Sequence, residues 1–248
     1  MELGLEGRTA IICGSASGMG LAVAEALAAE GANVAMFSRR REVLEREADR
    51  IGALAVQGDL TLPQHLERLV QATVGAFGAL DIVVLNGGGP PASQATSLTA
   101  SAVDEAVALL LTSHVTLVGH CLTHLRASGH GRILAIESSS VREPIDGLAL
   151  SNAVRPGVIG WLKTLARELG PDGITVNTIA PGQIDTQRMR ELHGDDGPSP
   201  KALQRIPLRR LGTAAEIGAV AAFLASERAS YVSGAVIPVD GGLTRSLL

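Results

Sequence analysis

The sequence has few cysteines, few aromatic residues and no long apolar run. Two distant cysteines, Cys13 and Cys121, provide no disulfide framework and are typical of a reducing compartment; we expect no metal site. One Trp, one Tyr and three Phe leave few rings for base stacking, and the net charge of −4 disfavours nucleic-acid binding. No window holds the roughly 18 consecutive apolar residues of a membrane span, and Met1–Arg8 lacks a signal pattern. These absences predict a cytoplasmic protein with neither a membrane nor a nucleic-acid partner.

What the sequence does contain is an alternation of short apolar runs and longer helical patterns. Nearly continuous apolar runs of this kind are typical of parallel strands that are covered on both faces. The expected strands are Thr9–Cys13, Asn33–Phe37, Ala53–Val56, Asp81–Leu85, Ile133–Ile136, Ile174–Ile179 and Ala235–Val239. The expected helices are Met19–Glu30, Arg41–Ile51, Pro63–Ala76, Ala102–Ala127, Pro156–Leu169 and Ala214–Ser226.

This alternation predicts an α/β fold built from βαβ units, with one doubly wound parallel sheet and helices on both faces. No linker, repeat or shift in composition divides the chain, so we expect a single domain over residues 1–248. The irregular stretch 183–210 is long for a loop in a compact fold, and such loops are usually functional or mobile.

The first expected strand runs directly into a glycine-rich turn, Gly14-Ser-Ala-Ser-Gly-Met-Gly20, and then into an Ala-rich helix. Glycines allow a tight turn and let backbone N–H groups approach a pyrophosphate, which the helix N-terminus also attracts. A glycine-rich turn without a ligand is the alternative, but the strand–loop–helix context favours dinucleotide binding.

The end of the second strand carries Ser38 and three arginines, Arg39, Arg40 and Arg41, where NAD-preferring sites place an acidic residue. Arginines at a helix start oppose the helix dipole, whereas a 2′-phosphate would form charge-assisted hydrogen bonds with them. We therefore expect NADP(H) to be preferred over NAD(H). A solvated basic corner is the alternative.

Two further turns are predicted at the same sheet edge. Asp59 follows the third strand and is a candidate for adenine contact, with an ordinary surface turn as the alternative. The turn Asn86-Gly-Gly-Gly89 follows the fourth strand, where small residues leave room for a ribose or simply serve the turn.

Four motifs in order resemble those of the short-chain dehydrogenase/reductase family, over essentially the whole chain. Cys13–Gly20 resembles the family's Thr-Gly-x-x-x-Gly-x-Gly motif, and Asn86–Gly89 resembles its Asn-Asn-Ala-Gly motif. Pro181–Thr186 resembles its Pro-Gly-x-x-x-Thr turn, and Val232–Gly242 is similar to its closing strand. The similarity is greatest to 3-oxoacyl-carrier-protein reductase-like members. It implies a Rossmann-type, seven-stranded sheet in the order 3-2-1-4-5-6-7 and a homotetramer. We expect a small carbonyl or alcohol substrate, and we expect the irregular stretch 183–210 to be a mobile substrate lid.

Together, the motifs and the resemblance define the expected cofactor contacts. They are Gly14, Ser15, Ser17, Gly18, Met19, Ser38, Arg39, Arg40, Asp59, Leu60, Asn86, Gly87, Gly88, Arg155, Pro181, Gly182, Ile184 and Thr186.

The catalytic set that the resemblance implies is Asn, Ser, Tyr and Lys, and only its serine is present, as Ser138. Counting from neighbouring motifs places the asparagine at Leu110, the tyrosine at Ser151 and the lysine at Arg155. A serine hydroxyl is a far weaker acid than a phenol, and a guanidinium does not release its proton. We take Ser138, Ser151 and Arg155 as the candidate catalytic residues.

Pro156 suits the first position of a helix, so we expect Ser151–Arg155 to be a loop or distorted turn. No other group stands out as a proton donor: we expect Glu137 to point away from the cleft and Tyr231 to pack against the sheet. His114 and His120 are expected on a helix surface or interface, and Glu143 and Asp146 as solvated loop charges.

Three functions remain open. One is an NADP(H)-dependent oxidoreductase with altered or reduced proton transfer, and the second is a catalytically silent NADP(H)-binding sensor, regulator or partner subunit. The third is a structural homotetramer whose cofactor only stabilises the fold. A fold by itself does not choose between them.

Overall fold

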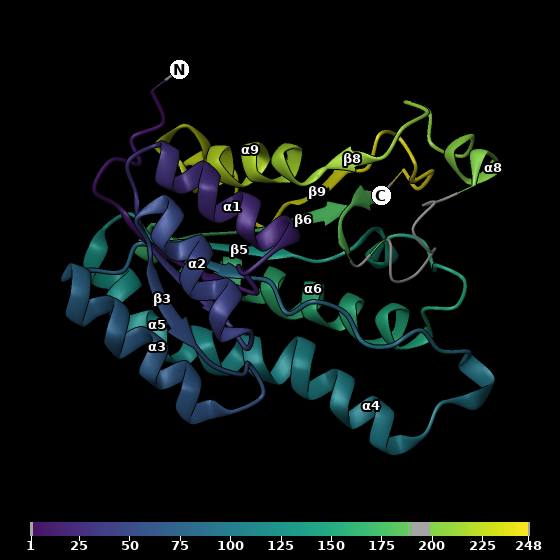
Figure 1. Cartoon of the computed structure of the whole chain (residues 1–248), viewed down its shortest axis with the longest axis horizontal. Helices are drawn as coiled ribbons and strands as arrows, with labels where there is room; N and C mark the ends of the chain where they lie inside the picture. Colours follow the sequence, from purple (N-terminus) through teal and green to yellow (C-terminus); the bar gives the residue numbers. More distant parts are fainter. Residues whose placement is uncertain (1, 188, 190–198, 248) are drawn as a thin grey trace.

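The core of the protein is a seven-stranded parallel sheet in the order β3-β2-β1-β4-β5-β6-β9 (Figure 1). The computed structural model describes residues 2–187, 189 and 199–247. Every neighbouring pair of strands in the sheet is parallel. Since β9 is the seventh strand of this sheet in chain order, the strand order matches the expected 3-2-1-4-5-6-7. The predicted fold class is therefore confirmed.

All seven predicted strands are present, with ends that shift by a residue or two. They are β1 Thr9–Cys13, β2 Asn33–Ser38, β3 Leu54–Gln57, β4 Ile82–Leu85, β5 Arg132–Ile136, β6 Thr175–Pro181 and β9 Val236–Val239. The α-helices described are α1 Gly18–Ala29, α2 Arg41–Ile51, α3 Pro63–Phe77, α4 Ala100–Val107, α5 Ser113–Ser128, α6 Ala149–Leu169, α8 Pro200–Leu203 and α9 Ala214–Ala225.

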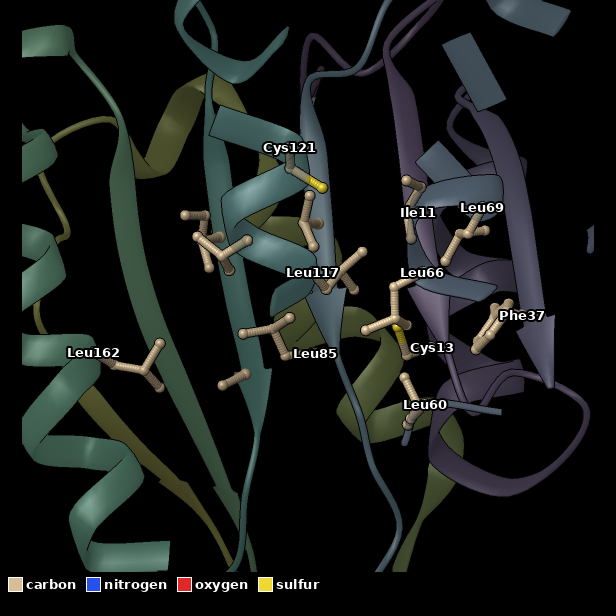
Figure 2. Packing of buried hydrophobic residues seen from close by; sticks show 14 of the residues in the cluster. Ile11, Cys13, Phe37, Leu60, Leu66, Leu69, Leu85, Leu117, Cys121 and Leu162 are labelled. Atoms are coloured by element: carbon tan, nitrogen blue, oxygen red, sulfur yellow. The ribbon is translucent and has the colours of Figure 1, made fainter. Parts of the chain in front are cut away.

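Helices cover both faces of the sheet, which explains why its strands are apolar throughout. Successive β1 residues point to opposite faces: Ile11 and Cys13 join the core under α3, α5 and α6, whereas Ile12 joins the core under α1, α2 and α9. Figure 2 shows the first core, where Leu117 of α5 lies near Leu85 at the end of β4 and Cys121 lies further along the same helix.

The prediction for the helix around Pro156 is wrong. Helix α6 begins two turns earlier, at Ala149, and Pro156 lies inside it. Leu150, Val154 and Val158 bury one stripe of this helix against the core, and this burial offsets the hydrogen bond that proline cannot donate. As a result, Ser151 and Arg155 lie in regular helix.

The predicted long helix Ala102–Ala127 is interrupted. A π-helical turn, Ala108–Thr112, separates α4 from α5. Single π-helical turns inside α-helices are often found at functional sites. By length and mean hydropathy, 1.6, the stretch Ala100–Ser128 would suffice to cross a membrane, but Leu117 and Leu125 belong to the core.

The stretch 183–210 contains ordered pieces that the sequence did not predict. Strand β7 Ile184–Asp185 and the short helix α8 lie within this stretch, and β7 pairs in a separate two-stranded parallel sheet with β8 Gly212–Thr213, just beyond its end. Residues 188 and 190–198 are outside the described part of the chain, and the lid remains a prediction.

Candidate active site

The glycine-rich turn after β1 is packed so closely that two of its glycines have no room for a side chain. Gly14 has φ +58°, and a Cβ on Gly20 would lie 2.4 Å from the carbonyl oxygen of Gly14. Asn86, beyond the end of β4, braces this turn because its Nδ2 donates to the carbonyl oxygens of Cys13 and Gly14 at 3.2 and 3.4 Å. The turn is therefore held from the neighbouring strand.

The start of α1 has the properties of an anion site. Its N-cap, Ser17, makes no side-chain capping bond, so the first N–H groups of the helix are left without a side-chain partner. Gly18 has φ +59°, and the nearest side-chain atom to its missing Cβ is the Thr186 methyl, at 3.6 Å. The structure thus places Thr186, from the segment after β7, beside the glycine-rich turn.

The three arginines after β2 point in different directions. Arg40 donates from Nη2 to Ser17 Oγ and from its backbone N–H to Ser38 Oγ. Arg41 instead pairs with Glu45 at 2.8 Å on the surface of α2, and the exposed Arg39 side chain makes no hydrogen bond to any residue that the structure describes. The cation that reaches across to the glycine-rich turn is therefore Arg40.

Several predicted contact residues use their side chains for hydrogen bonds or packing within the protein. Ser15 is fully buried, and its Oγ accepts from the Phe37 N–H at 2.9 Å. Asp59 Oδ1 accepts from both the N–H and the hydroxyl of Thr61, and the backbone bond lowers the pKa of Asp59. Leu60 lies in the core under α3, α5 and α6, and Met19 packs against the core on the opposite face of the sheet. The side chains of Ser15 and Leu60 are therefore not free for a ligand, whereas Asp59 and Met19 are only half-buried.

The remaining predicted residues lie at the same carboxyl edge of the sheet. Pro181 is the last residue of β6, and Gly182 comes next. Gly182 lies so close to Asp240 that a Cβ on Gly182 would be 2.6 Å from the Asp240 Cβ. The side chain of Ile184 in β7 is buried. Thr186 Oγ1 accepts from the Met189 N–H at 3.3 Å.

The positions of the missing tyrosine and lysine form a connected polar cluster. Arg155 donates from Nε to Ser151 Oγ at 3.0 Å, from Nη1 to Glu137 Oε2 at 2.8 Å and from Nη2 to the carbonyl oxygen of Gly88 at 2.5 Å. Arg155 and Glu137 are 5% and 4% exposed. A second hydroxyl, Ser140 Oγ, lies 3.2 Å from Ser151 Oγ.

The expectation that Glu137 points away from the cleft is wrong. Side chains do alternate along β5, but α6 covers the face of Ile133 and Ala135, and Glu137 continues that face toward Arg155. Burial raises the pKa of the Glu137 carboxyl, and the Arg155 guanidinium opposes this shift. Its second oxygen, Oε1, is buried and has no hydrogen-bond partner in the part of the chain that the structure describes.

Ser138 occupies a different place from its neighbour Ser140. Its Oγ accepts from the Ser140 N–H at 3.1 Å and caps a short 3₁₀ turn, Ser139–Val141. The hydroxyl that meets position 151 is therefore that of Ser140, which sequence reasoning did not select. The run of three serines was the signal that could have suggested it.

Two more predictions fail. His114 is fully buried beside Gly87 rather than on the helix surface, and neither of its ring nitrogens has a hydrogen-bond partner among the described residues. Burial lowers the pKa of His114 to about 3, and the positive charge of Arg155 contributes. Tyr231, expected to pack against the sheet, is fully exposed because it lies in the turn that leads into β9.

Leu110, at the position of the missing asparagine, is fully buried in the π-helical turn.

Comparison with known proteins gives a consistent picture. The family model described as "Enoyl-(Acyl carrier protein) reductase" matches residues 14–244. The chain is 35% identical to a cyclohexanol dehydrogenase of Rhodococcus sp., covering 99% of both chains. It is 33% identical to the 3-oxoacyl-[acyl-carrier-protein] reductase FabG of Escherichia coli, covering 97% of this chain and 99% of the relative. Among solved structures, L-sorbose reductase from Gluconobacter frateurii, complexed with NADPH and L-sorbose, matches with a TM-score of 0.91, 30% identity and full coverage of both chains.

Proposed function

Because the chain belongs to the short-chain dehydrogenase/reductase family, we propose that it is an NADP(H)-dependent oxidoreductase of a small carbonyl or alcohol substrate. The observation that carries the cofactor assignment is the bridge from Arg40 to Ser17 Oγ, which places a cation between the end of β2 and the glycine-rich turn. The complex of the related L-sorbose reductase with NADPH supports the same choice.

The chain fits such a cofactor along the carboxyl edge of the sheet. In this proposal the N–H groups at the start of α1 bind the pyrophosphate, Ser38, Arg39 and Arg40 bind the 2′-phosphate, and the turn after Asn86 lies beside the ribose. Pro181, Gly182, Ile184 and Thr186 line the nicotinamide end. When bound, the cofactor supplies or accepts the hydride.

The substrate end differs from that of relatives with a phenol. Carbonyl reduction adds a proton to oxygen as well as a hydride to carbon. The candidates Ser138, Ser151 and Arg155 offer hydroxyl donors and a positive charge but no acid that titrates near neutrality. Loss of general acid catalysis costs about 10²–10⁴-fold. We therefore expect normal cofactor binding with slow carbonyl reduction.

A second candidate function is a cofactor-binding protein without turnover. The observation in its favour is that the three hydrogen bonds of Arg155 tie it to Ser151, Glu137 and Gly88 in a buried cluster, an arrangement that serves structure as well as chemistry.

One experiment separates the two functions. NADPH and NADH are titrated by the fluorescence of the bound dihydronicotinamide, and NADPH consumption is then followed across a panel of ketones, diketones and 3-oxoacyl thioesters. Turnover of any member supports the oxidoreductase. Tight NADPH binding with no turnover of this panel, nor of the matching alcohols with NADP⁺, supports the silent protein, and equal affinity for the two cofactors contradicts the NADP(H) assignment.

A further inference from the structure

The buried cluster around Arg155 has a direction, because its members differ in what they can donate. A guanidinium has only donors, so Ser151 Oγ must accept from Arg155 Nε. The hydrogen of the Ser151 hydroxyl must then point elsewhere. Among the described residues, the recorded partner left for it is Ser140 Oγ, at 3.2 Å.

The positive charge of Arg155 favours one direction for this serine pair. A hydroxyl that accepts a charge-assisted hydrogen bond becomes a stronger donor, because hydrogen bonds in a chain polarise one another. Ser151 is therefore the donor and Ser140 the acceptor. Among the described residues, the hydrogen of the Ser140 hydroxyl is then left without a partner, in a residue that is 3% exposed.

Glu137 determines where the guanidinium lies. Its Oε2 accepts from Arg155 Nη1 at 2.8 Å, and its side chain is completely buried. A guanidinium is planar, so fixing Nη1 on Glu137 and Nη2 on the Gly88 carbonyl oxygen also fixes the direction of Nε toward Ser151.

From these contacts we propose that Ser140 is the hydroxyl that donates to the substrate oxygen, and that Glu137 is a positioning residue acting on it through Arg155 and Ser151. The proposal rests on the proposed oxidoreductase function and refines its substrate end. It departs from the family resemblance, in which Ser138 has this role; here Ser138 Oγ caps the turn that carries Ser140.

The first test measures the position of Arg155 without any turnover. The side-chain Nε–H of Arg155 is observed by ¹⁵N NMR and assigned with Arg155→Lys. We expect slow hydrogen exchange in the parent and at least tenfold faster exchange in Glu137→Gln, because the guanidinium loses its anchor. The matched control is Glu143→Gln, whose carboxylate accepts from the Arg245 N–H outside the cluster; it should exchange like the parent.

Glu137→Gln leaves a buried cation without a counter-charge, so its folding is checked by circular dichroism. If it does not fold, Glu137→Asp decides the question, because it keeps the charge but is one methylene shorter. Faster Nε–H exchange in Glu137→Asp supports the positioning role. Exchange equal to that of the parent, in whichever variant folds, overturns it.

The second test measures turnover with NADPH and the best carbonyl of the panel. Ser140→Ala, Ser151→Ala and Glu137→Gln (or Glu137→Asp) should each lower kcat by about 10–10³-fold, with KM and NADPH affinity changed less than twofold. The Ser140→Ala/Ser151→Ala double variant should be no slower than the slower single variant, because both belong to one chain of donors. Ser139→Ala should match the parent.

The outcomes are distinct for the two proposals. A parent that binds NADPH but turns over no carbonyl overturns the oxidoreductase function and the donor role of Ser140, while the NMR result still decides the positioning role of Glu137. An active parent whose Ser140→Ala variant keeps its kcat overturns the donor role alone. Additive losses from Ser140→Ala and Ser151→Ala would also contradict a single chain.

Discussion

Ser151 and Arg155 lie one turn apart on the same face of α6, with Arg155 Nε 3.0 Å from Ser151 Oγ. This is the spacing at which two helical side chains meet. The site thus keeps the geometry of the Tyr-x-x-x-Lys pair that the family resemblance implies, with a different pair of chemical groups.

Arg40→Ala should weaken NADPH binding selectively. Hydrogen bonds to charged groups contribute on the order of 1.5–3 kcal/mol, so the Kd for NADPH should rise by about 10–150-fold while that for NADH changes little. Isothermal titration with both cofactors measures this. Arg41→Ala is the control because Arg41 pairs with Glu45 on α2. Equal losses for the two cofactors would contradict a 2′-phosphate site at Arg40.

Pro156→Ala should stabilise the protein without changing kcat. Pro156 is exposed inside α6 and provides no N–H to the carbonyl oxygen of Asn152. Removing the proline should raise the free energy of unfolding by about 1–3 kcal/mol, as measured by urea denaturation. A lower stability would mean that proline's restriction of the unfolded chain outweighs the missing bond.

His114→Leu should make the protein less sensitive to acid. The pKa of His114 is about 3 in the folded state, below the usual 6.5, so the unfolded chain binds more protons as the pH falls through that interval. The contribution of His114 to the free energy of unfolding is therefore fully present above pH 6.5 and falls as the pH drops toward 3. At pH 5 the loss should be about 2 kcal/mol.

Urea denaturation at pH 7.5 and pH 5 measures this loss. We expect a smaller difference between the two pH values for His114→Leu than for the parent. His120→Leu, from a half-buried position on the same helix, is the matched substitution. An unchanged difference in His114→Leu would show that other groups cause the loss of stability in acid.

The protein should associate through the outer faces of α5 and α6. Val115 is 43% exposed on α5, Ile159 and Trp161 are only half-buried on α6, and the neighbouring exposed positions Gly157 and Gly160 allow close packing. Light scattering at micromolar concentration should give more than one copy, as expected of the predicted homotetramer. Val115→Glu should lower the measured mass. A stable monomer in the parent would contradict this interface.

The sheet and the tight glycine-rich turn after β1 could be predicted from the sequence because both depend on short-range patterns. A strand that is covered on both faces needs a continuous apolar run, and seven such runs separated by helical patterns leave few possible arrangements. The tight turn after β1 requires glycine at Gly14 and Gly20, whatever the rest of the chain does. The mapping of positions 151 and 155 likewise followed from their spacing to neighbouring motifs.

The tertiary structure alone decided which groups meet at the substrate end. The pairing of Glu137 with Arg155 joins residues 18 positions apart and depends on which face of β5 is covered by α6, which the alternation of side chains does not specify. Likewise, packing rather than proline's local preference determined where α6 begins, because the apolar stripe from Leu150 to Val158 is buried only when that turn is helical. Charged and hydroxyl groups were visible in the sequence, but the direction of their hydrogen bonds is a property of the packed helices.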